Sequence, residues 1–562
     1  LRSAEAGEQK LHKRKALAIL SSDALSSVAY GPEQILIVLV TAGTAAFWYS
    51  IPIAVGVLFL LMILISSYRQ IIYAYPNGGG AYLVSKNNLS VNFGLVAGGS
   101  LLVDYILTVA VSVSAGSDAI TSAIPVLHSY KVEIAVLFVV LITILNLRGI
   151  TESASILAYP VYLFVFALFL LIGTGIFKIL TGQVPADLHT SIPNFKEPAP
   201  TNASKTLVIM GCLLGALFSG IVFLAFYYGI SPMNEVTVLS QIGEDVFGRN
   251  IFYYFLQGTT ALILILAANT GYTAFPLLAV NLAKDKYIPR MFTVRGDRLG
   301  YSNGIIILGF LSIVLILVFK GQTEQLIPLY AVGVFIPFTL SQSGMTLKWF
   351  RERPIGWIQK LVINASGALI SFVVTMIFFI TKFTQVWSVL VFLPVIIFVF
   401  HKIHKHYEGV GEQLRISNEV KNISIEGNII IVPVAGITRV VENTLNYAKS
   451  LSAQQIIAVR VSFDREDEKK FVQKWKEWQP EIRLVSLHSQ YRSLIQPLTK
   501  FVDIVEHKAS ESNYQVTVMI PQFIPKKGWH NILHNQSSLL IRAFLLYKRN
   551  VVITTVPYHL IK

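Results

Sequence analysis

The chain contains eleven apolar runs, each long enough to cross a lipid bilayer, between residue 16 and about residue 402. A bilayer core about 30 Å thick is spanned by about 20 residues of α-helix. Charged residues make up 14% of the chain, whereas soluble domains carry about 25%. The runs therefore predict an α-helical membrane bundle and exclude an ordinary soluble protein. They lie near residues 16–42, 49–73, 93–124, 132–147, 154–178, 206–230, 251–280, 304–320, 326–347, 360–381 and 386–402.

Basic residues predict which loops face the cytoplasm. The net charge is +15, and Lys and Arg concentrate in segment 1–15 and in the loops at 284–298 and 348–360. Short cytoplasmic loops are enriched in Lys and Arg, so all three should lie on that side. Seven predicted spans separate the first segment from the second, and an odd number puts them on opposite sides. We therefore predict that one further span is missing from this chain near Ser191, which gives about twelve spans with both termini cytoplasmic.

The composition changes after about residue 407, where charged residues become frequent and apolar runs shorten. Five short runs rich in Val and Ile predict buried strands, with helical patterns such as 438–450 and 465–477 between them. Strands that alternate with helices are typical of a parallel α/β sheet. We expect a cytoplasmic segment at 1–15, a transmembrane domain at 16–407 and a cytoplasmic α/β domain at 408–562. The predicted strands are 428–434, 455–461, 482–487, 515–520 and 550–555.

Signals for an enzyme are weak. Gly436, after the first predicted strand, stands alone, without a G-x-G-x-x-G or Walker pattern. The single cysteine, Cys212, excludes an intrachain disulfide framework and a cysteine metal cluster. Loops at the strand ends of such a sheet often bind nucleotides. A role in regulatory packing or dimerisation is an equally good interpretation of this domain. We predict that the protein is not an enzyme and holds no cofactor.

Two carboxylates at bilayer depth are candidate cation ligands. Because a charge inside the membrane is costly, an ionisable residue there is by default a candidate functional residue. Asp23 lies in a polar interruption of the first span, at residues 21–27, and a broken helix exposes carbonyl oxygens that coordinate cations. Asp104 lies in the third span, where spacings of four put Thr108 and Ser112 on the same helix face. Carboxylate and hydroxyl oxygens suit a hard monovalent cation or protons.

Each candidate also has a purely structural interpretation. Asp23 would cap a helix that begins there, and the hydroxyls of Thr108 and Ser112 would form interhelical hydrogen bonds. Asp118 points roughly the same way as Asp104 but lies near the far membrane face. A solvated helix end is the favoured interpretation of Asp118, and a cation entrance is the alternative. Tyr330 is an uncharged polar group in a span, for which packing is the favoured interpretation.

Three motifs make the chain resemble the KUP-type potassium transporters of the amino acid–polyamine–organocation superfamily. The segment 20–31 reads LSSDALSSVAYG, the segment 75–82 reads YPNGGGAY and the segment 101–108 reads LLVDYILT. The first motif is highly specific, whereas the glycine-rich motif is shared more widely with amino-acid permeases. The resemblance extends over nearly the whole chain, including the tail.

The resemblance implies a LeuT-like fold of two inverted five-helix repeats, with helices 1 and 6 broken, plus two further spans. It also implies a tail similar to universal stress proteins, through which two subunits pair. Cyclic di-AMP is the implied regulator, and Arg439, Lys526 and Lys527 are candidate phosphate partners, although solvated surface charge explains them equally well. The residues implied to line the potassium path are Asp23, Tyr30, Asp104, Thr108, Ser112 and Tyr330.

We therefore predict a secondary active potassium importer of the bacterial cell membrane, driven by proton symport and regulated through its tail. Its expected partners are potassium, protons, membrane lipids and a second copy of the chain, and not nucleic acid. An amino-acid permease is one alternative, but the negative charge of Asp23 should repel a substrate carboxylate. A membrane receptor that senses a ligand through its tail is the other, and only the α/β domain favours it.

Overall fold

A computed structural model of the chain describes most of its residues and divides them into two compact units, Leu1–Arg415 and Ile416–Lys562. For residues 13–23, 41, 154–158 and 205–212 only the backbone is described. The described residues are 13–41, 46, 49–75, 80–148, 154–182, 205–233, 236–294, 301–415, 425–479, 481–489, 493–525, 537–548 and 550–560.

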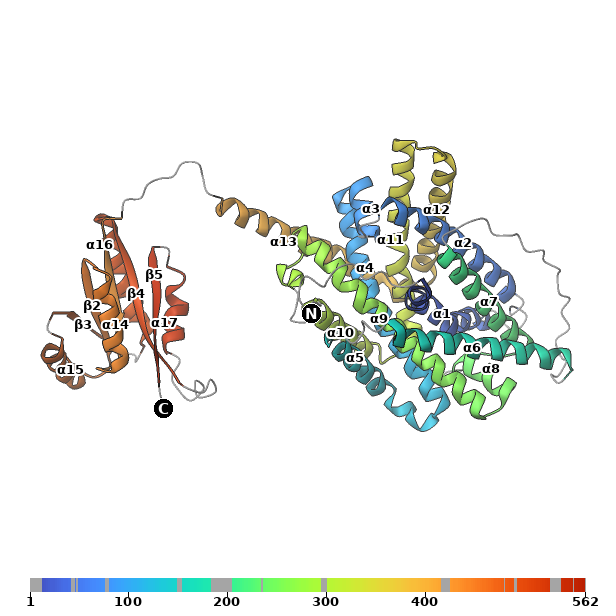
Figure 1. The fold of residues 1–562 in the computed structure, drawn as a ribbon, viewed down its shortest axis with the longest axis horizontal. Helices are drawn as coiled ribbons and strands as arrows, with labels where there is room; N and C mark the ends of the chain where they lie inside the picture. The colour runs from blue at the N-terminus through green and yellow to red at the C-terminus, as the bar shows by residue number, and fades with distance from the viewer. Residues whose placement is uncertain are drawn as a thin grey trace. The chain divides into compact units, whose positions relative to one another are not determined.

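Every one of the eleven predicted runs forms a helix in the first unit (Figure 1). Among the described residues, eight helices are long and apolar enough to cross a membrane, and three further apolar helices are shorter. The predicted helical membrane domain is confirmed. The helices of the runs are α1 (Lys13–Thr41), α2 (Ser50–Ala74), α4 (Val91–Ala123), α5 (Lys131–Leu147), α6 (Ala154–Leu180), α7 (Lys205–Tyr227), α9 (Ile251–Lys284), α10 (Ser302–Val318), α11 (Thr323–Glu352), α12 (Trp357–Thr381) and α13 (Phe383–Gln413).

Within the part of the chain that the structure describes, four short helices lie between these spans. They are α3 (Gly80–Asn88), η3 (Pro125–Tyr130), α8 (Val238–Phe247) and η5 (Arg290–Thr293). The glycine-rich motif ends in α3, whose first residue, Gly80, has a φ of 47°. That left-handed conformation is readily adopted only by glycine, and it turns the chain into the short helix.

The predicted break in the first span is wrong. α1 is continuous through residues 21–27, even though five of those seven residues are Ser or Asp. Serine lowers helix propensity only slightly, and that stretch contains neither glycine nor proline to disfavour the helix. Gly31 and Pro32 follow within the same helix, because neighbouring membrane helices let a proline be tolerated there.

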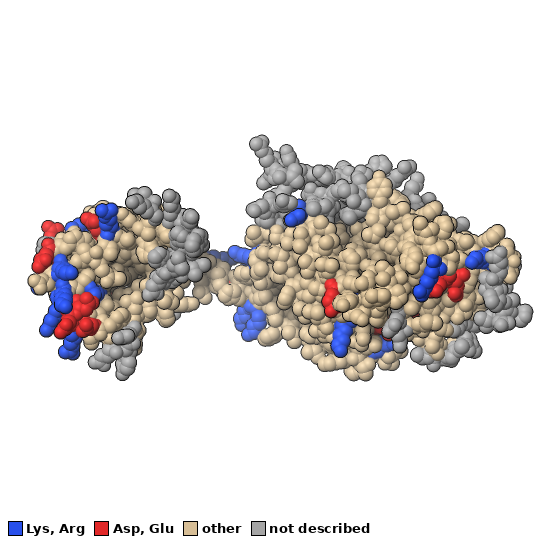
Figure 2. Space-filling model, turned by 90° about the horizontal axis from the view of Figure 1, so that it is seen from below, with Lys and Arg blue, Asp and Glu red and all other residues tan. Residues whose placement is uncertain are grey.

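α4 lies at the centre of the bundle, against α9, α10 and α11. In the apolar stretch of α4, 67% of the residues are buried, whereas the corresponding share in α13 is 11%. α13 therefore presents its apolar side chains to lipid, while α4 presents them to protein. α9 approaches α4 closely at Gly271, where an added Cβ would lie 3.0 Å from the carbonyl oxygen of Tyr105. Small residues permit such close helix contacts in membranes. Figure 2 shows the corresponding surface, on which charged residues are sparse over the larger unit.

The second unit is a parallel α/β sheet, as predicted. All four strand pairs are parallel, in the order β3-β2-β1-β4-β5. The central strand β1 is a continuous apolar run from Ile429 to Val432, buried on both faces, as parallel sheets require. The strands are β1 (Gly427–Pro433), β2 (Gln455–Ser462), β3 (Arg483–His488), β4 (Tyr514–Ile524) and β5 (Val551–His559).

Helices cover both faces of this sheet (Figure 1). Val441 of α14 and Trp475 of α15 pack on one face, and Val502 of α16 and Ile541 of α17 pack on the other. Along the chain, β1, β2 and β3 follow one another toward one edge of the sheet, and β4 and β5 follow one another toward the opposite edge. The strand order therefore reverses between β1 and β4. The helices are α14 (Arg439–Ser450), α15 (Arg465–Trp478), α16 (Ile495–Glu511) and α17 (Ser537–Leu545). The last membrane helix, α13, continues past residue 407, which was expected to end the membrane domain.

Candidate functional site

Asp104 lies near the middle of α4, with its side chain 7% exposed. Thr108 and Ser112 follow one and two turns further along the same face, and both are buried. The Thr108 hydroxyl donates a hydrogen bond to the backbone carbonyl of Asp104, at 2.9 Å. That bond uses the only hydroxyl proton, so the Thr108 oxygen presents lone pairs, which are what a cation needs.

α11 passes directly over Asp104. An added Cβ on Gly333 would lie 3.5 Å from both Cα and Cβ of Asp104. Ser100, one turn before Asp104, donates a hydrogen bond to the Gly333 carbonyl at 3.0 Å. The absence of a side chain at Gly333 therefore lets the α11 backbone lie against the backbone and Cβ of Asp104, whereas a leucine at this position would push the helix away.

The structure places the two predicted tyrosines against the same apolar cluster of the bundle. Tyr30 of α1 and Tyr330 of α11 are both half-buried, and both pack against the apolar cluster that contains Leu107 of α4. The Tyr30 hydroxyl lies 3.1 Å from the hydroxyl of Ser27. Residues from α1, α4 and α11 thus contribute to one apolar cluster. Asp23 lies in α1, one of these helices, but its side chain is outside the described part of the chain.

A cavity of about 550 Å³ lies at the C-terminal end of α4. Asp118 lines it, but its carboxylate is not a free charge. One oxygen pairs with the ammonium of Lys131, and the other accepts a hydrogen bond from Thr323 at 2.8 Å. Asp118 therefore links α4 to the starts of α5 and α11. Tyr30, another of the predicted path residues, also lines this cavity.

Sequence reasoning missed two residues of this cavity. Glu33 of α1 lines it together with Lys131. Glu33 lies within the first predicted span, so the rule that selected Asp23 would have selected it as well. Lys131 begins a span and was therefore indistinguishable from an ordinary basic residue at a membrane edge.

The opposite end of α4 lies beside a second polar cluster. Asp285, at the end of α9, accepts a hydrogen bond from the Tyr82 hydroxyl at 2.5 Å and pairs with Lys86 at 2.7 Å. Burial, and then the bond to Asp285, raise the pKa of Tyr82, so this phenol stays protonated and donates. Tyr287, two residues further on, stacks on His404 of α13 with ring centroids 4.4 Å apart. The final membrane helix is thereby joined to the end of α9.

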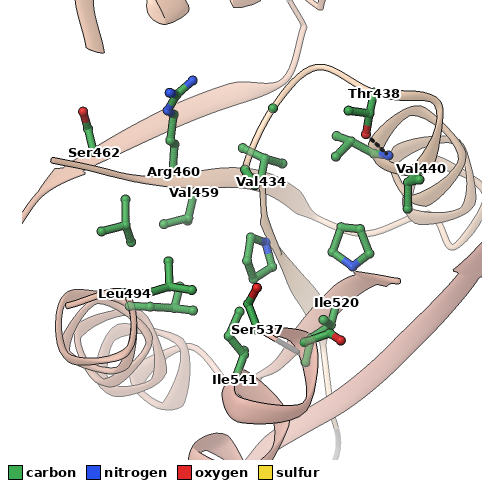
Figure 3. A pocket seen from close by; sticks show the side chains of 18 of the residues that line it. Val434, Thr438, Val440, Val459, Arg460, Ser462, Leu494, Ile520, Ser537 and Ile541 are labelled. Carbon is green, nitrogen blue, oxygen red and sulfur yellow. Dashed lines mark hydrogen bonds between the residues drawn. The ribbon is translucent and has the colours of Figure 1, made fainter. Parts of the chain in front are cut away.

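A pocket of about 760 Å³ lies in the second unit, at the carboxyl ends of β1, β2 and β4 (Figure 3). This is the point at which the strand order reverses, where open α/β sheets bind their ligands. Val434 and Val459 form part of its floor, and Ser537 and Ile541 of α17 line one side (Figure 3). The helix α14 starts at the pocket, because Thr438 lines it and caps that helix.

Basic groups at this pocket are few. Arg460 lines it, but its guanidinium pairs with Asp467 at 2.5 Å and lies over the ring of Phe471 at 3.7 Å. Arg439, one of the predicted phosphate partners, is exposed at the start of α14 and does not line the pocket, although its neighbour Thr438 does. Two further predicted partners, Lys526 and Lys527, lie outside the described residues. Within the described part of the chain, no three His, Cys, Asp or Glu side chains group as a metal site.

The fold and these sites define a multi-pass membrane transporter of the amino acid permease type, and not an enzyme. Residues 14–200 and 192–400 match the amino acid permease family, and residues 426–558 match the KimA potassium transporter C-terminal domain. The chain is 60% identical to the potassium transporter KimA of Bacillus subtilis (strain 168), over 100% of this chain and 97% of that protein. The chain therefore belongs to the KimA family.

A more distant relative matches about a third of the chain. The low-affinity putrescine importer PlaP of Escherichia coli (strain K12) is 24% identical over 192 residues, which is 34% of this chain and 39% of that protein. Membership of the amino acid permease family rests on the match over residues 14–400, and the substrate of this relative is not assigned to the chain.

The comparisons also bear on the span predicted to be missing. The alignment to KimA runs over 593 positions, 31 more than the 562 residues of the chain, so KimA has residues with no counterpart here. The amino acid permease match consists of two pieces that overlap at residues 192–200. The missing span near Ser191, in a stretch outside the described residues, stays a prediction.

The ion pair at the cavity provides a stability test. We expect Lys131→Met to lower the free energy of unfolding by about 2 kcal/mol, less than the loss for a fully buried pair, because it leaves the half-buried Asp118 carboxylate without its cation. Adding Asp118→Asn should recover most of that loss, since the uncompensated charge is removed. Thermal unfolding of the full chain in detergent measures both variants. The matched control is Lys548→Met, which breaks the more exposed pair with Asp503 and should cost less than about 1 kcal/mol. Equal losses of unfolding free energy at the two pairs would contradict a larger contribution from the Lys131–Asp118 pair.

Proposed function

We propose that the protein imports potassium ions together with protons, and that its α/β unit regulates this transport. The observation that carries the proposal is the buried Asp104, with Thr108 and Ser112 on its face and the backbone of α11 at Gly333 against it. The 60% identity to a potassium transporter over the full chain supports the choice of ion.

The proposed path uses oxygen ligands from three helices. Asp23 and Tyr30 would contribute from α1, Asp104 from α4 and Tyr330 from α11. Potassium is a hard cation that exchanges its hydration shell for carboxylate, hydroxyl and carbonyl oxygens. The carboxylates supply the negative charge that balances a positive ion, the other oxygens are neutral, and this composition is poor for an apolar substrate. The hydroxyls of Thr108 and Ser112 would complete the path along α4.

The same acidic lining argues against transport of amino acids. A substrate carboxylate entering past Glu33 and Asp118 would meet negative side chains and a single lysine that is already paired. A receptor function has no observation of its own in its favour, since the α/β unit serves equally well to regulate transport.

Asp118 and its neighbours have a proposed role as the outer entrance. Pairing with Lys131 and Thr323 holds together the starts of α5 and α11. Glu33 and Tyr30 both line the cavity that a cation would enter. We propose that Glu33 and Asp118 supply the acidic oxygens of this entrance, and that the pairing of Asp118 also fixes the geometry of the cavity.

We propose that both termini lie in the cytoplasm. Contacts of α3 support this orientation, because Lys86 pairs with Asp285 at the end of α9 while Asn88 accepts a hydrogen bond from Arg351 at the end of α11. The two basic loops that follow α9 and α11 therefore share one face of the bundle. A shared basic face is what the positive-inside rule requires of the cytoplasmic side.

The α/β unit is proposed to act as a regulatory and dimerisation domain that binds cyclic di-AMP. Its pocket lies at the strand-order reversal, and the N-terminus of α14, capped by Thr438, supplies backbone donors for a phosphate. A ligand changes transport only if it favours one state of the bundle over another. The stacked pair Tyr287–His404 offers a route, because α13 leads directly into this unit.

The path residues give the first transport prediction. Asp104→Asn should abolish potassium uptake in proteoliposomes, and Asp23→Asn should do the same, because each removes the charge that balances the ion. Thr108→Ala should reduce uptake at least tenfold. Its matched control is Ser117→Ala, which removes a hydroxyl that also donates to its own helix backbone, at 3.0 Å, and should leave uptake unchanged. Normal uptake by Asp104→Asn would remove this carboxylate from the path.

Proton coupling gives a separate prediction. A membrane potential of 100 mV contributes about 2.3 kcal/mol per charge, which limits potassium accumulation by a uniporter to roughly 50-fold. Cotransport of a proton about doubles the electrical driving force, and an inward proton gradient adds to it. Accumulation above the uniport limit, measured at a clamped potential, should therefore collapse when the proton gradient is removed. Unchanged accumulation would identify a uniporter.

The pocket gives a test of regulation. We expect cyclic di-AMP to inhibit uptake by the full chain and Gly436→Trp to relieve that inhibition, because an indole would fill the pocket. Gly436 has open space around its Cβ position and no positive φ, so the substitution fits the backbone. Gly436→Ala is the matched control and should remain inhibited. Calorimetric titration of the full chain measures binding, and binding that persists in Gly436→Trp would place the ligand elsewhere.

A further inference from the structure

The ends of α2, α11 and α12 form a surface that transport does not use. Arg69 lies near the end of α2, Lys348 and Arg351 near the end of α11, Arg353 in the turn that follows, and Trp357 and Lys360 at the start of α12. We call these six residues the basic–aromatic patch. Contacts between α2 and α12 and between α11 and α12 hold the three helix ends together.

The patch carries a large excess of positive charge. Segment 348–360 contains four basic residues and a single acidic one, Glu352. Glu352 lies 3.6 Å from Lys348 and is itself largely exposed. Arg351 and Arg353 are exposed as well. A cluster of this kind at the end of membrane helices matches the negative charge of phospholipid headgroups.

Aromatic rings hold the basic side chains along the bundle surface. The Arg353 guanidinium lies 5.4 Å from the ring of Phe350 and 5.6 Å from that of Trp357. The Lys360 ammonium lies 4.9 Å from the ring of Trp349. Such cation–π contacts leave the outer side of each cationic group available to an anion. Trp residues also concentrate at the level of the headgroups.

The turn between α11 and α12 exposes apolar side chains beside these charges. Ile355 is 100% exposed and Ile358 is 60% exposed. The turn has a left-handed residue at each end, Arg353 with a φ of 44° and Gly356 with a φ of 73°, which projects Ile355 outward. A fully exposed isoleucine beside three basic residues is unfavourable in water, but it fits a membrane interface where acyl chains receive it while headgroups contact the charges.

We infer that the basic–aromatic patch binds the headgroups of anionic phospholipids, with Ile355 inserted among their acyl chains. Arg351, Arg353 and Lys360 contact the phosphate, and Trp357 fixes the depth of the turn. A soluble anion would use the charges but not the apolar tip. A protein partner is disfavoured because the adjoining face of α12 is apolar and only 22% of its span is buried, so lipid already surrounds the site.

The test uses the full chain in detergent, titrated with phosphatidylglycerol, and reads affinity from the rise in melting temperature. Each basic residue near an anionic surface contributes about 1 kcal/mol, so Arg351→Gln/Arg353→Gln/Lys360→Gln should weaken phosphatidylglycerol binding by about 100-fold. Ile355→Ser changes a fully exposed side chain, cannot disturb folding through packing, and should weaken binding severalfold. Phosphatidylcholine should give a much smaller rise in every variant.

Lys469→Gln/Lys470→Gln/Lys476→Gln is the matched control, because it removes three charges from exposed positions of α15. It should leave phosphatidylglycerol affinity unchanged. Unaltered affinity in the patch variant, or an equal loss in the control, would overturn the inference. Glycerol phosphate that stabilises the chain as strongly as phosphatidylglycerol would also overturn it, since the site would then bind a soluble anion. Where the triple variant fails to fold, Arg353→Gln and Ile355→Ser give the same decision.

Discussion

A bilayer supplies no partners for charged side chains, so each charge within the bundle has to be compensated by the protein or by its cargo. At one end of α4 the compensation is internal, because Lys131 and Thr323 satisfy both oxygens of Asp118. In the middle of α4, Asp104 lies against the backbone of α11 at Gly333 and in line with two hydroxyls. Asp118 therefore holds helices together, whereas the role proposed for Asp104 is to bind the transported cation.

The position of Asp104 depends on how closely three helices approach one another. Gly271 lets α9 lie against Tyr105, and Gly333 lets α11 lie against Asp104. Because α9 ends at Asp285, beside Tyr82 of α3 and the Tyr287–His404 stack, any shift of α9 against α4 also moves the contacts of α13. The geometry therefore links the proposed ion path to the helix that leads into the α/β unit.

The α/β unit and the membrane unit form their sites in different ways. The sheet produces its pocket by topology, since the strand order reverses between β1 and β4 and the loops diverge there. The membrane bundle produces its cavity from side chains of α1, α4 and α11 that converge at one end. The basic–aromatic patch forms in a third way, because a tight turn exposes Ile355 beside basic side chains and a tryptophan.

The sequence by itself determined the helices and strands, because hydropathy and β-branched runs act locally. All eleven apolar runs became helices, and the strand predicted at 428–434 is β1 at 427–433. It also selected Asp104, Thr108 and Ser112, since their spacing fixes a common face. The break predicted in α1 failed because serine residues alone do not interrupt a helix.

Only the tertiary structure decided which charges are paired and which residues share a cavity. Asp118 and Lys131 are 13 positions apart in the chain, and Thr323 is 205 positions from Asp118, so their contact is invisible to any local pattern. Glu33 and Tyr30 join that cavity through the packing of α1 on α9. Hydrophobicity selects which segments enter the membrane, but the close approach of particular helices determines which polar atoms meet there.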